Sequence, residues 1–318
     1  MRAYAADRHG DLSELRLRDL PTPRPGPREL LVHVKAAAIN PADLKVLARR
    51  DGGWFLRAPG FPLVLGFDFS GTVVERGAAA GPAHPIGDEV YGFLPYSPLT
   101  RGGTFAEYVA VDAAIVGRKP RALSHEQAAA AATSAVSALQ ALRDRGRLAP
   151  GHRVLVNGAS GGVGSYAVAI ARTLGARVVA TASAGKCDHV LALGAERVAD
   201  YRTTGLAELG GAFAVILDVA STSSFAACAP LLAPAGAYVA FLPSLPLAGG
   251  LVRAALSAKR CTFLVARPVA RDLDQLAAWF DSGRLAPVVD RVYPLAELPA
   301  ALAHQRAGQV RGKLAISL

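Results

Sequence analysis

The sequence predicts an α/β protein in which a doubly wound parallel sheet is inserted into a smaller, β-rich domain. Residues 1–120 contain short apolar runs separated by glycine and proline, a pattern typical of strands and turns. From residue 153 onward, continuous apolar runs alternate with helical stretches, which indicates a parallel sheet covered on both faces. Residues 267–318 follow a complete six-stranded sheet and have no place in it. We therefore assign one domain to 1–120 plus 267–318 and the other to 121–266.

Length and composition exclude several classes of protein. At roughly 150 residues per domain, 318 residues suggest about two domains, and 52% hydrophobic with 19% charged residues excludes a mainly disordered chain. No apolar run has the length of a signal peptide or a transmembrane helix, so we expect a cytoplasmic protein with no membrane partner. The cysteines lie too far apart for a CxxC zinc site or a disulfide framework, which agrees with a reducing compartment; they are Cys187, Cys228 and Cys261.

The net charge of +10 comes mainly from arginines spread along the chain. Spread charge of this kind is usually a solvated surface. It also suits an anionic small molecule, and it leaves weak nucleic-acid binding open.

The N-terminal domain is expected to be a strongly bent, barrel-like set of strands. Prolines between residues 21 and 27 keep that segment extended, because proline disfavours both helix and central strand. Strands are expected at 30–36, 64–74, 89–93 and 104–111. An alanine-rich helix follows Ser124, which with Gln127 has the spacing of a capping box.

The inserted domain is expected to have the Rossmann arrangement, six parallel strands with right-handed helical crossovers. Its strands are predicted at 153–159, 177–183, 197–201, 214–220, 237–243 and 261–266. Its helices are predicted at 163–174, 186–193, 204–209 and 223–231.

A glycine-rich turn gives the strongest local signal. Gly158, Gly161 and Gly164 are spaced G-x-x-G-x-x-G between a buried strand and a helix that begins near Gly162. Glycine permits the tight turn and lets a pyrophosphate approach the backbone N–H groups, and the helix N-terminus adds partial positive charge. The turn therefore predicts a dinucleotide site.

The end of the second Rossmann strand indicates which dinucleotide binds. NAD-binding folds usually place Asp or Glu there to bind the ribose 2′-hydroxyl, but this segment has no acid before Asp188. Ser183 and Lys186 instead offer a hydroxyl and a cation, which fits the 2′-phosphate of NADPH. The alternative is that Ser183 caps the next helix and Lys186 is solvated.

Several segments resemble zinc-independent members of the medium-chain dehydrogenase/reductase superfamily, in the quinone oxidoreductase and enone (alkenal) reductase branch. They are AAAINPADLK (36–45), PLVLGFDFSGTVV (62–74), GDEVYG (87–92), GTFAEYV (103–109) and LGAERVADYR (193–202). The resemblance runs in order over essentially the whole chain. It implies a GroES-like domain built from both chain ends, with a Rossmann domain inserted.

Zinc-dependent relatives hold a catalytic metal through Cys, a His with a neighbouring acid, and a second Cys. The resemblance places Asn40, Phe67 with Asp68, and Thr133 at these positions. One carboxylate and neutral side chains cannot form a tetrahedral N/S site, so we expect no metal.

The resemblance also implies the site residues. It places Asn40 beside the nicotinamide and Lys45 at a position where some enone reductases have Lys. Asp68 is expected to orient the Lys45 ammonium. The alternative for Lys45 is a surface lysine. Tyr201 is expected to share the 2′-phosphate site. The predicted cofactor-binding residues are Thr133, Ser137, Gly158, Ser160, Gly161, Gly162, Val163, Gly164, Ser183, Lys186, Tyr201, Phe241, Leu242 and Val265.

These features predict an NADPH-dependent reductase that transfers hydride to a small-molecule quinone or α,β-unsaturated carbonyl without a metal. An alternative is a dedicated enoyl reductase or cyclising reductase of a biosynthetic pathway. A third is a non-catalytic RNA-binding relative, which the basic charge would help but no aromatic-interleaved basic motif supports. The apolar sixth strand, 261–266, predicts a homodimer through that sheet edge.

Overall fold

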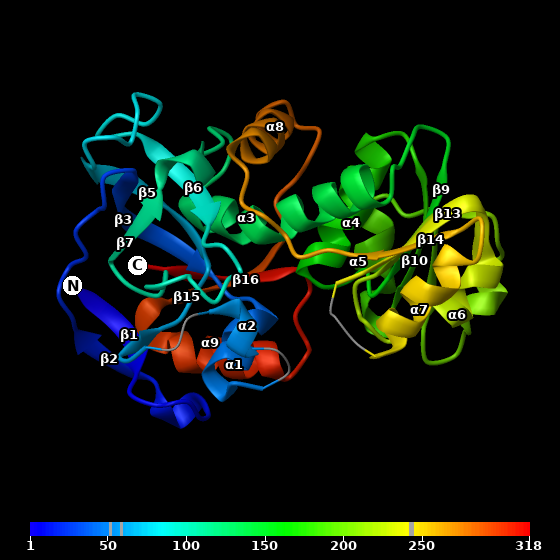
Figure 1. Ribbon diagram of the computed structural model, residues 1–318, viewed down its shortest axis with the longest axis horizontal. Helices are drawn as coiled ribbons and strands as arrows, with labels where there is room; N and C mark the ends of the chain where they lie inside the picture. The colour runs from blue at the N-terminus through cyan, green and yellow to red at the C-terminus, as the bar shows by residue number, and fades with distance from the viewer. Residues whose placement is uncertain (51–52, 58–59, 242–244) are drawn as a thin grey trace. The chain divides into compact units, whose positions relative to one another are not determined.

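The computed structural model describes residues 1–50, 53–57, 60–241 and 245–318 (Figure 1). The chain forms two compact units, Met1–Val136 with Arg267–Leu318, and Ser137–Ala266. The second unit ends at residue 266. It begins at residue 137, within helix α3 (His125–Gln140), because the earlier residues of this helix are bonded to the sheet of the first unit.

The first unit is built on a seven-stranded sheet of order β15-β16-β3-β5-β6-β8, in which β7 also pairs with β3. Its strands are β3 (Glu29–Ala38), β5 (Asp68–Arg76), β6 (Glu89–Phe93), β7 (Tyr108–Asp112), β8 (Val116–Arg118), β15 (Val289–Pro294) and β16 (Lys313–Ser317). A three-stranded sheet joins β2 (Arg16–Asp19), β1 (Arg2–Ala6) and β4 (Leu63–Val64). The helices are α1 (Pro41–Ala48), α2 (Gly53–Leu56), α8 (Ala270–Asp281), α9 (Leu298–Arg306) and residues 125–136 of α3.

The C-terminal segment completes this sheet, as the sequence predicts. Strand β16, red in Figure 1, runs antiparallel to β3, so that Ala315 lies opposite Ala38. The pairing brings Lys313, the first residue of β16, close to the residues that follow β3. Apolar side chains from the early strands and from β16 share one core with helix α9.

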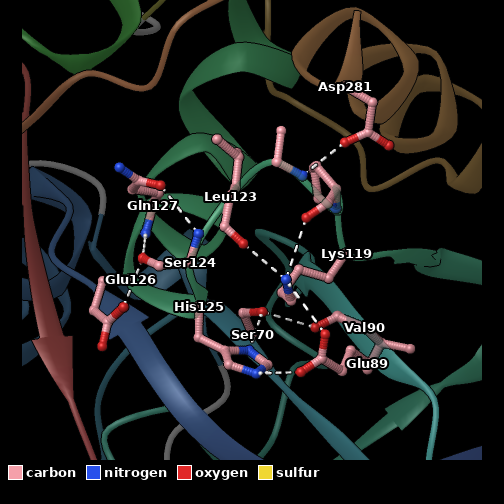
Figure 2. Close-up of polar contacts among 12 residues, drawn as sticks. Ser70, Glu89, Val90, Lys119, Leu123, Ser124, His125, Glu126, Gln127 and Asp281 are labelled. Carbon is pink, nitrogen blue, oxygen red and sulfur yellow. Dashed lines mark hydrogen bonds and ion pairs between the residues drawn. The ribbon is translucent and has the colours of Figure 1, made fainter.

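A chain of side-chain contacts fastens the start of α3 to this sheet (Figure 2). Ser70 Oγ lies 2.8 Å from His125 Nδ1, and His125 Nε2 lies 3.1 Å from Glu89 Oε1. Lys119 Nζ lies 3.3 Å from the second Glu89 oxygen. The order Ser–His–Glu is that of a hydrolytic triad, but Ser70 is 0% exposed and its hydroxyl donates to the Val90 carbonyl at 2.9 Å. These contacts therefore have a structural role: they attach α3 to the sheet. Burial of the His125 imidazole lowers its pKa.

The second unit contains the predicted doubly wound sheet. Its six parallel strands have the order β11-β10-β9-β12-β13-β14, which is the Rossmann order. They are β9 (Arg153–Asn157), β10 (Arg177–Ala182), β11 (Arg197–Asp200), β12 (Phe213–Asp218), β13 (Leu232–Ala240) and β14 (Arg260–Phe263). The helices are α4 (Gly162–Thr173), α5 (Cys187–Ala192), α6 (Phe225–Cys228) and α7 (Leu245–Ala255). Strand β14 is shorter than expected, so Val265 lies beyond its end.

Candidate functional site

Four buried polar side chains of the first unit contact one another, and we call them the buried polar cluster: Asn40, Asp68, Thr133 and Lys313. Lys313 Nζ donates to Asn40 Oδ1 at 2.6 Å and lies 3.1 Å from Asp68 Oδ2. Asn40 Nδ2 donates to the same Asp68 oxygen at 2.9 Å. Thr133 donates its N–H to Asp68 Oδ1 at 3.1 Å and its hydroxyl to the same oxygen. The Asp68 carboxylate is therefore fully buried and accepts four hydrogen bonds, which compensates its loss of water.

Local structure explains how these residues meet. Asn40 caps the N-terminus of α1 directly after β3, Asp68 begins β5, and the two strands pair so that Ala38 lies opposite Asp68. Thr133 lies on α3, and the contact between His125 and Ser70 holds this helix against the same sheet. Lys313 comes from the far end of the chain through the β16–β3 pairing.

A second carboxyl group, that of Asp43, lies in the first turn of α1. It accepts the backbone N–H of Asn40 at 2.7 Å and that of Gly66 at 3.1 Å, and it is fully buried. Burial raises the pKa of Asp43 to about 7, against the lowering effect of the Asn40 hydrogen bond and the Lys313 charge. Through these two hydrogen bonds, Asp43 holds together the segments that precede α1 and β5, which carry Asn40 and Asp68.

Two further side chains, Tyr96 and Lys45, differ in their relation to this cluster. The Tyr96 ring packs on the Phe67 ring, with centroids 4.5 Å apart. Burial, with the charges of Asp68 and Asp43, raises the pKa of Tyr96 well above its usual value. Lys45 lies on α1 and is partly exposed, and within the described part of the chain its ammonium has no hydrogen bond or ion pair. The structure therefore does not bring Lys45 into contact with Asp68.

The glycine-rich turn of the second unit has the geometry that a pyrophosphate needs. Gly158 has φ +87°, and a Cβ on Gly164 would lie 2.2 Å from the Gly158 carbonyl oxygen, so both positions require glycine. A Cβ on Gly161 would meet nothing within 4 Å, so the space beside the α4 N-terminus is open. Ser160, Gly162 and Val163 are partly exposed at this helix end, whose first N–H groups lack intrahelical partners. These residues fit a dinucleotide pyrophosphate.

A buried hydrogen-bond network supports the turn from below. Asn157 Nδ2 donates to Asp218 Oδ1 at 2.8 Å, and Thr181 Oγ1 donates to Asn157 Oδ1 at 2.7 Å. The Gly158 N–H donates to Thr181 Oγ1 at 3.1 Å, and the Tyr238 hydroxyl donates to Asp218 Oδ2 at 2.7 Å. Burial and this carboxylate raise the pKa of Tyr238. The network joins the carboxyl ends of β9, β10, β12 and β13. It was not predicted from the sequence, because these residues form no recognisable motif.

The predicted 2′-phosphate residues lie at the ends of β10 and β11. Ser183 follows β10, Lys186 lies three residues later at the start of α5, and Tyr201 follows β11 and is 54% exposed. The Tyr201 N–H donates to the Ala182 carbonyl at 3.2 Å, so the two strand ends are adjacent.

The remaining predicted cofactor residues lie in α3 and after the ends of β13 and β14. Ser137 is buried in α3, one turn after Thr133. Phe241 is partly buried after β13, and Val265 is 42% exposed. Leu242 lies outside the described residues.

The positions that would hold a catalytic zinc in zinc-dependent relatives do not fit that metal. Asn40 and Asp68 bind the Lys313 ammonium, Phe67 contributes a fully buried phenyl ring, and no thiolate or imidazole is present among them. Throughout the described ranges, no three His, Cys, Asp or Glu side chains are grouped so that they could hold a metal ion.

Comparisons with known proteins agree with this architecture. The alcohol dehydrogenase GroES-like domain family matches residues 26–121, and the family described as zinc-binding dehydrogenase matches residues 193–316. The chain is 30% identical to the mitochondrial NAD(P)H oxidoreductase RTN4IP1 of Mus musculus, over 92% of this chain and 82% of that protein. It is 29% identical to a 2-methylene-furan-3-one reductase of Solanum lycopersicum, over 99% of this chain and 79% of that protein.

Solved structures give the same result. The quinone oxidoreductase of Coxiella burnetii superposes with a TM-score of 0.89 and 29% identity, over 100% of this chain and 99% of that one. The chain therefore belongs to the medium-chain dehydrogenase/reductase family. It is an oxidoreductase with a nicotinamide cofactor, and the predicted combination of GroES-like and Rossmann domains is confirmed.

The expected compartment stays a prediction. No helix in the described part of the chain combines the length and the apolar character that crossing a membrane requires.

Proposed function

We propose that this protein uses NADPH to reduce quinones or α,β-unsaturated carbonyls, and that it does so without a metal ion. The observation that carries the proposal is the buried polar cluster, in which the Lys313 ammonium binds the oxygens of Asn40 and Asp68. A site with this set of groups offers an N–H of the Asn40 amide to a reducible carbonyl, and it offers no N/S ligands to a Lewis-acidic metal. The quinone and enone reductases among its relatives support the same substrate classes.

The second unit would hold the cofactor. The turn at Gly158–Gly164 and the N-terminus of α4 would bind the pyrophosphate, and the network of Asn157 and Thr181 would keep that turn in place. Ser183, Lys186 and Tyr201 would bind the 2′-phosphate.

The first unit would bind and polarise the substrate. When bound, the cofactor supplies a hydride. Negative charge then develops on the carbonyl oxygen, and hydrogen-bond donors that already point at that position stabilise it. We assign this role to the Asn40 amide and the Lys45 ammonium. Thr133, Ser137, Phe241 and Val265 are assigned to the surroundings of the nicotinamide.

A substrate screen tests the proposal directly. Consumption of NADPH is followed with a panel of simple quinones, enones and saturated aldehydes, before and after treatment with a chelator, and the metal content of the purified protein is measured. We expect turnover of quinones or enones that the chelator leaves unchanged. One zinc per chain, or turnover restricted to saturated aldehydes, contradicts the proposal. A dedicated enoyl or cyclising reductase would show only weak turnover across the whole panel.

The protein is also proposed to form a homodimer through β14. This strand is the last in the sheet, and Phe263 and Val265 are 40% and 42% exposed at its end. An edge strand with unpaired backbone groups and apolar side chains is a ready template for pairing with a second copy.

A further inference from the structure

The Lys313 ammonium has as many acceptors as it has protons. Its Nζ donates to the Ile39 carbonyl at 2.6 Å and to Asn40 Oδ1 at 2.6 Å, and it lies 3.1 Å from Asp68 Oδ2. An ammonium group has three N–H donors and no acceptor, so all three are used within the protein. The side chain is 5% exposed, and Lys313 therefore cannot easily exchange these partners for water or for a ligand.

This arrangement determines the orientation of the Asn40 carboxamide. Its oxygen must face Lys313, because a flipped amide would direct N–H groups at an ammonium that accepts no hydrogen bond. Its nitrogen therefore faces Asp68, to which one N–H donates at 2.9 Å. In the described part of the chain this is the one hydrogen bond of Asn40 Nδ2, so its second N–H is available to a ligand.

We propose that Lys313 is a positioning residue that orients the Asn40 amide for catalysis. The consequence for catalysis rests on the proposed function, whereas the orientation of Asn40 does not. Lys313 acts through Asn40, since its own protons are engaged by the protein. The free Asn40 N–H is the group that the substrate oxygen or the nicotinamide amide would meet.

The chain offers an unusually direct test of the orientation, because it contains only two asparagines, Asn40 and Asn157. Protein labelled with ¹⁵N in the asparagine side chains gives two NH₂ pairs in an NMR spectrum, and Asn40→Ala assigns them. We expect Lys313→Met to shift the Asn40 pair and accelerate its exchange with solvent. The Asn157 pair should stay in place, since that residue is bonded within the other unit. Lys35→Met, on strand β3, is the matched control and should move neither pair.

Kinetics then test whether Lys313 acts through Asn40. We expect Lys313→Met to lower kcat about tenfold or more in the wild-type background and less than about twofold in the Asn40→Ala background. The dissociation constant of NADPH should stay within about threefold of the wild-type value. A merely structural role would lower kcat by the same factor in both backgrounds, which would overturn the catalytic part of the proposal.

The test does not depend on one variant folding. If Lys313→Met fails to fold, Asp68→Asn combined with Lys313→Met removes both charges and leaves no buried ion unpaired. The Asn40 pair should be displaced further in this double variant than in Asp68→Asn alone, and both spectra contain a third NH₂ pair from the amide introduced at position 68. Two results would overturn the proposal. One is that the Asn40 pair of the wild type exchanges with solvent as fast as that of an exposed asparagine. The other is that Lys313→Met leaves the shift and the exchange rate of the Asn40 pair unchanged. If the quinone and enone screen fails while the Asn40 pair responds, the substrate assignment is wrong and the positioning of Asn40 is right.

Discussion

The ammonium of Lys313 lies 3.1 Å from the carboxylate of Asp68, although 245 residues separate them in the chain. The contact exists because β16 pairs with β3 in one particular register, with Ala315 opposite Ala38. Both charged groups are buried, so neither can exchange its partner for water without a large cost. The site of the first unit therefore depends on a strand that follows the whole second unit.

Cofactor preference is expected to depend on Lys186. If Ser183, Lys186 and Tyr201 bind the 2′-phosphate, NADPH should bind at least about tenfold more tightly than NADH, worth about 1.4 kcal/mol. Lys186→Ala should weaken NADPH binding and leave NADH binding nearly unchanged. Arg197→Ala, an exposed cation on neighbouring strand β11, is the control. Dissociation constants from fluorescence titration measure both, and equal affinities in the wild type would refute the assignment.

Lys45 is expected to matter more for enones than for quinones. A reduced quinone delocalises its charge and is protonated readily in water, whereas an enolate depends more on a nearby donor. Removing one such donor typically lowers turnover by about 10²–10³. Lys45→Ala should therefore lower kcat on an enone more than on a quinone and keep NADPH affinity within about threefold, roughly 0.7 kcal/mol. Arg50→Ala on the adjoining segment serves as the control. Unchanged rates on both substrates would show that Lys45 is a solvated side chain of α1.

The stability of the protein should contain a contribution from Asp43 that falls as pH rises. Its pKa is about 7 in the folded protein, above the value near 3.9 of an exposed Asp, so the folded state binds the proton more tightly than the unfolded state. This contribution is complete below about pH 4 and is lost as pH rises toward 7, by up to about 4 kcal/mol.

Asp43→Asn tests that pH dependence. It should lower stability at pH 4, because an amide nitrogen then faces a backbone N–H, and it should remove this part of the slope between pH 4 and 7. Chemical denaturation across that range measures the difference from the wild type. Asp19→Asn, at an exposed position, is the control. A variant whose slope equals that of the wild type would show that Asp43 does not titrate there.

The β14 edge is expected to be the surface through which two copies associate. Phe263→Lys places a charge on this edge and should shift the mass in light scattering from dimer to monomer at micromolar concentration. Ile86→Lys, at an exposed apolar position of the other unit, should leave the mass unchanged. A wild-type protein of monomeric mass at that concentration would contradict the assignment.

The sequence is informative where chemistry and local pattern coincide. The glycine spacing at Gly158–Gly164 and the alternation of strands and helices predict the Rossmann unit, and the motif at 36–45 singles out Asn40. Lys313 could not be found in this way, because a lysine before an apolar strand usually faces solvent, and only the β16–β3 register directs it inward. Asp43 was missed for a related reason, since burial, and not residue type, sets its pKa.

The domain boundary shows the same limit. Composition changes near residue 120, but His125 and Thr133 hold α3 against the sheet that contains Ser70 and Asp68. Such long-range hydrogen bonds leave no local pattern in the sequence. They place the boundary within a continuous helix.

The insertion of one unit into the other also determines the order in which the polar cluster can form during synthesis. A ribosome that adds about 5–20 residues per second makes Asp68 well before it makes Lys313, and the interval is on the order of ten to fifty seconds. During that interval the second unit can fold on its own strands, whereas β3 lacks its neighbour β16. The nascent chain therefore passes through a stage with an exposed strand edge and a carboxylate without its cation. At this stage we expect the chain to depend most on chaperones.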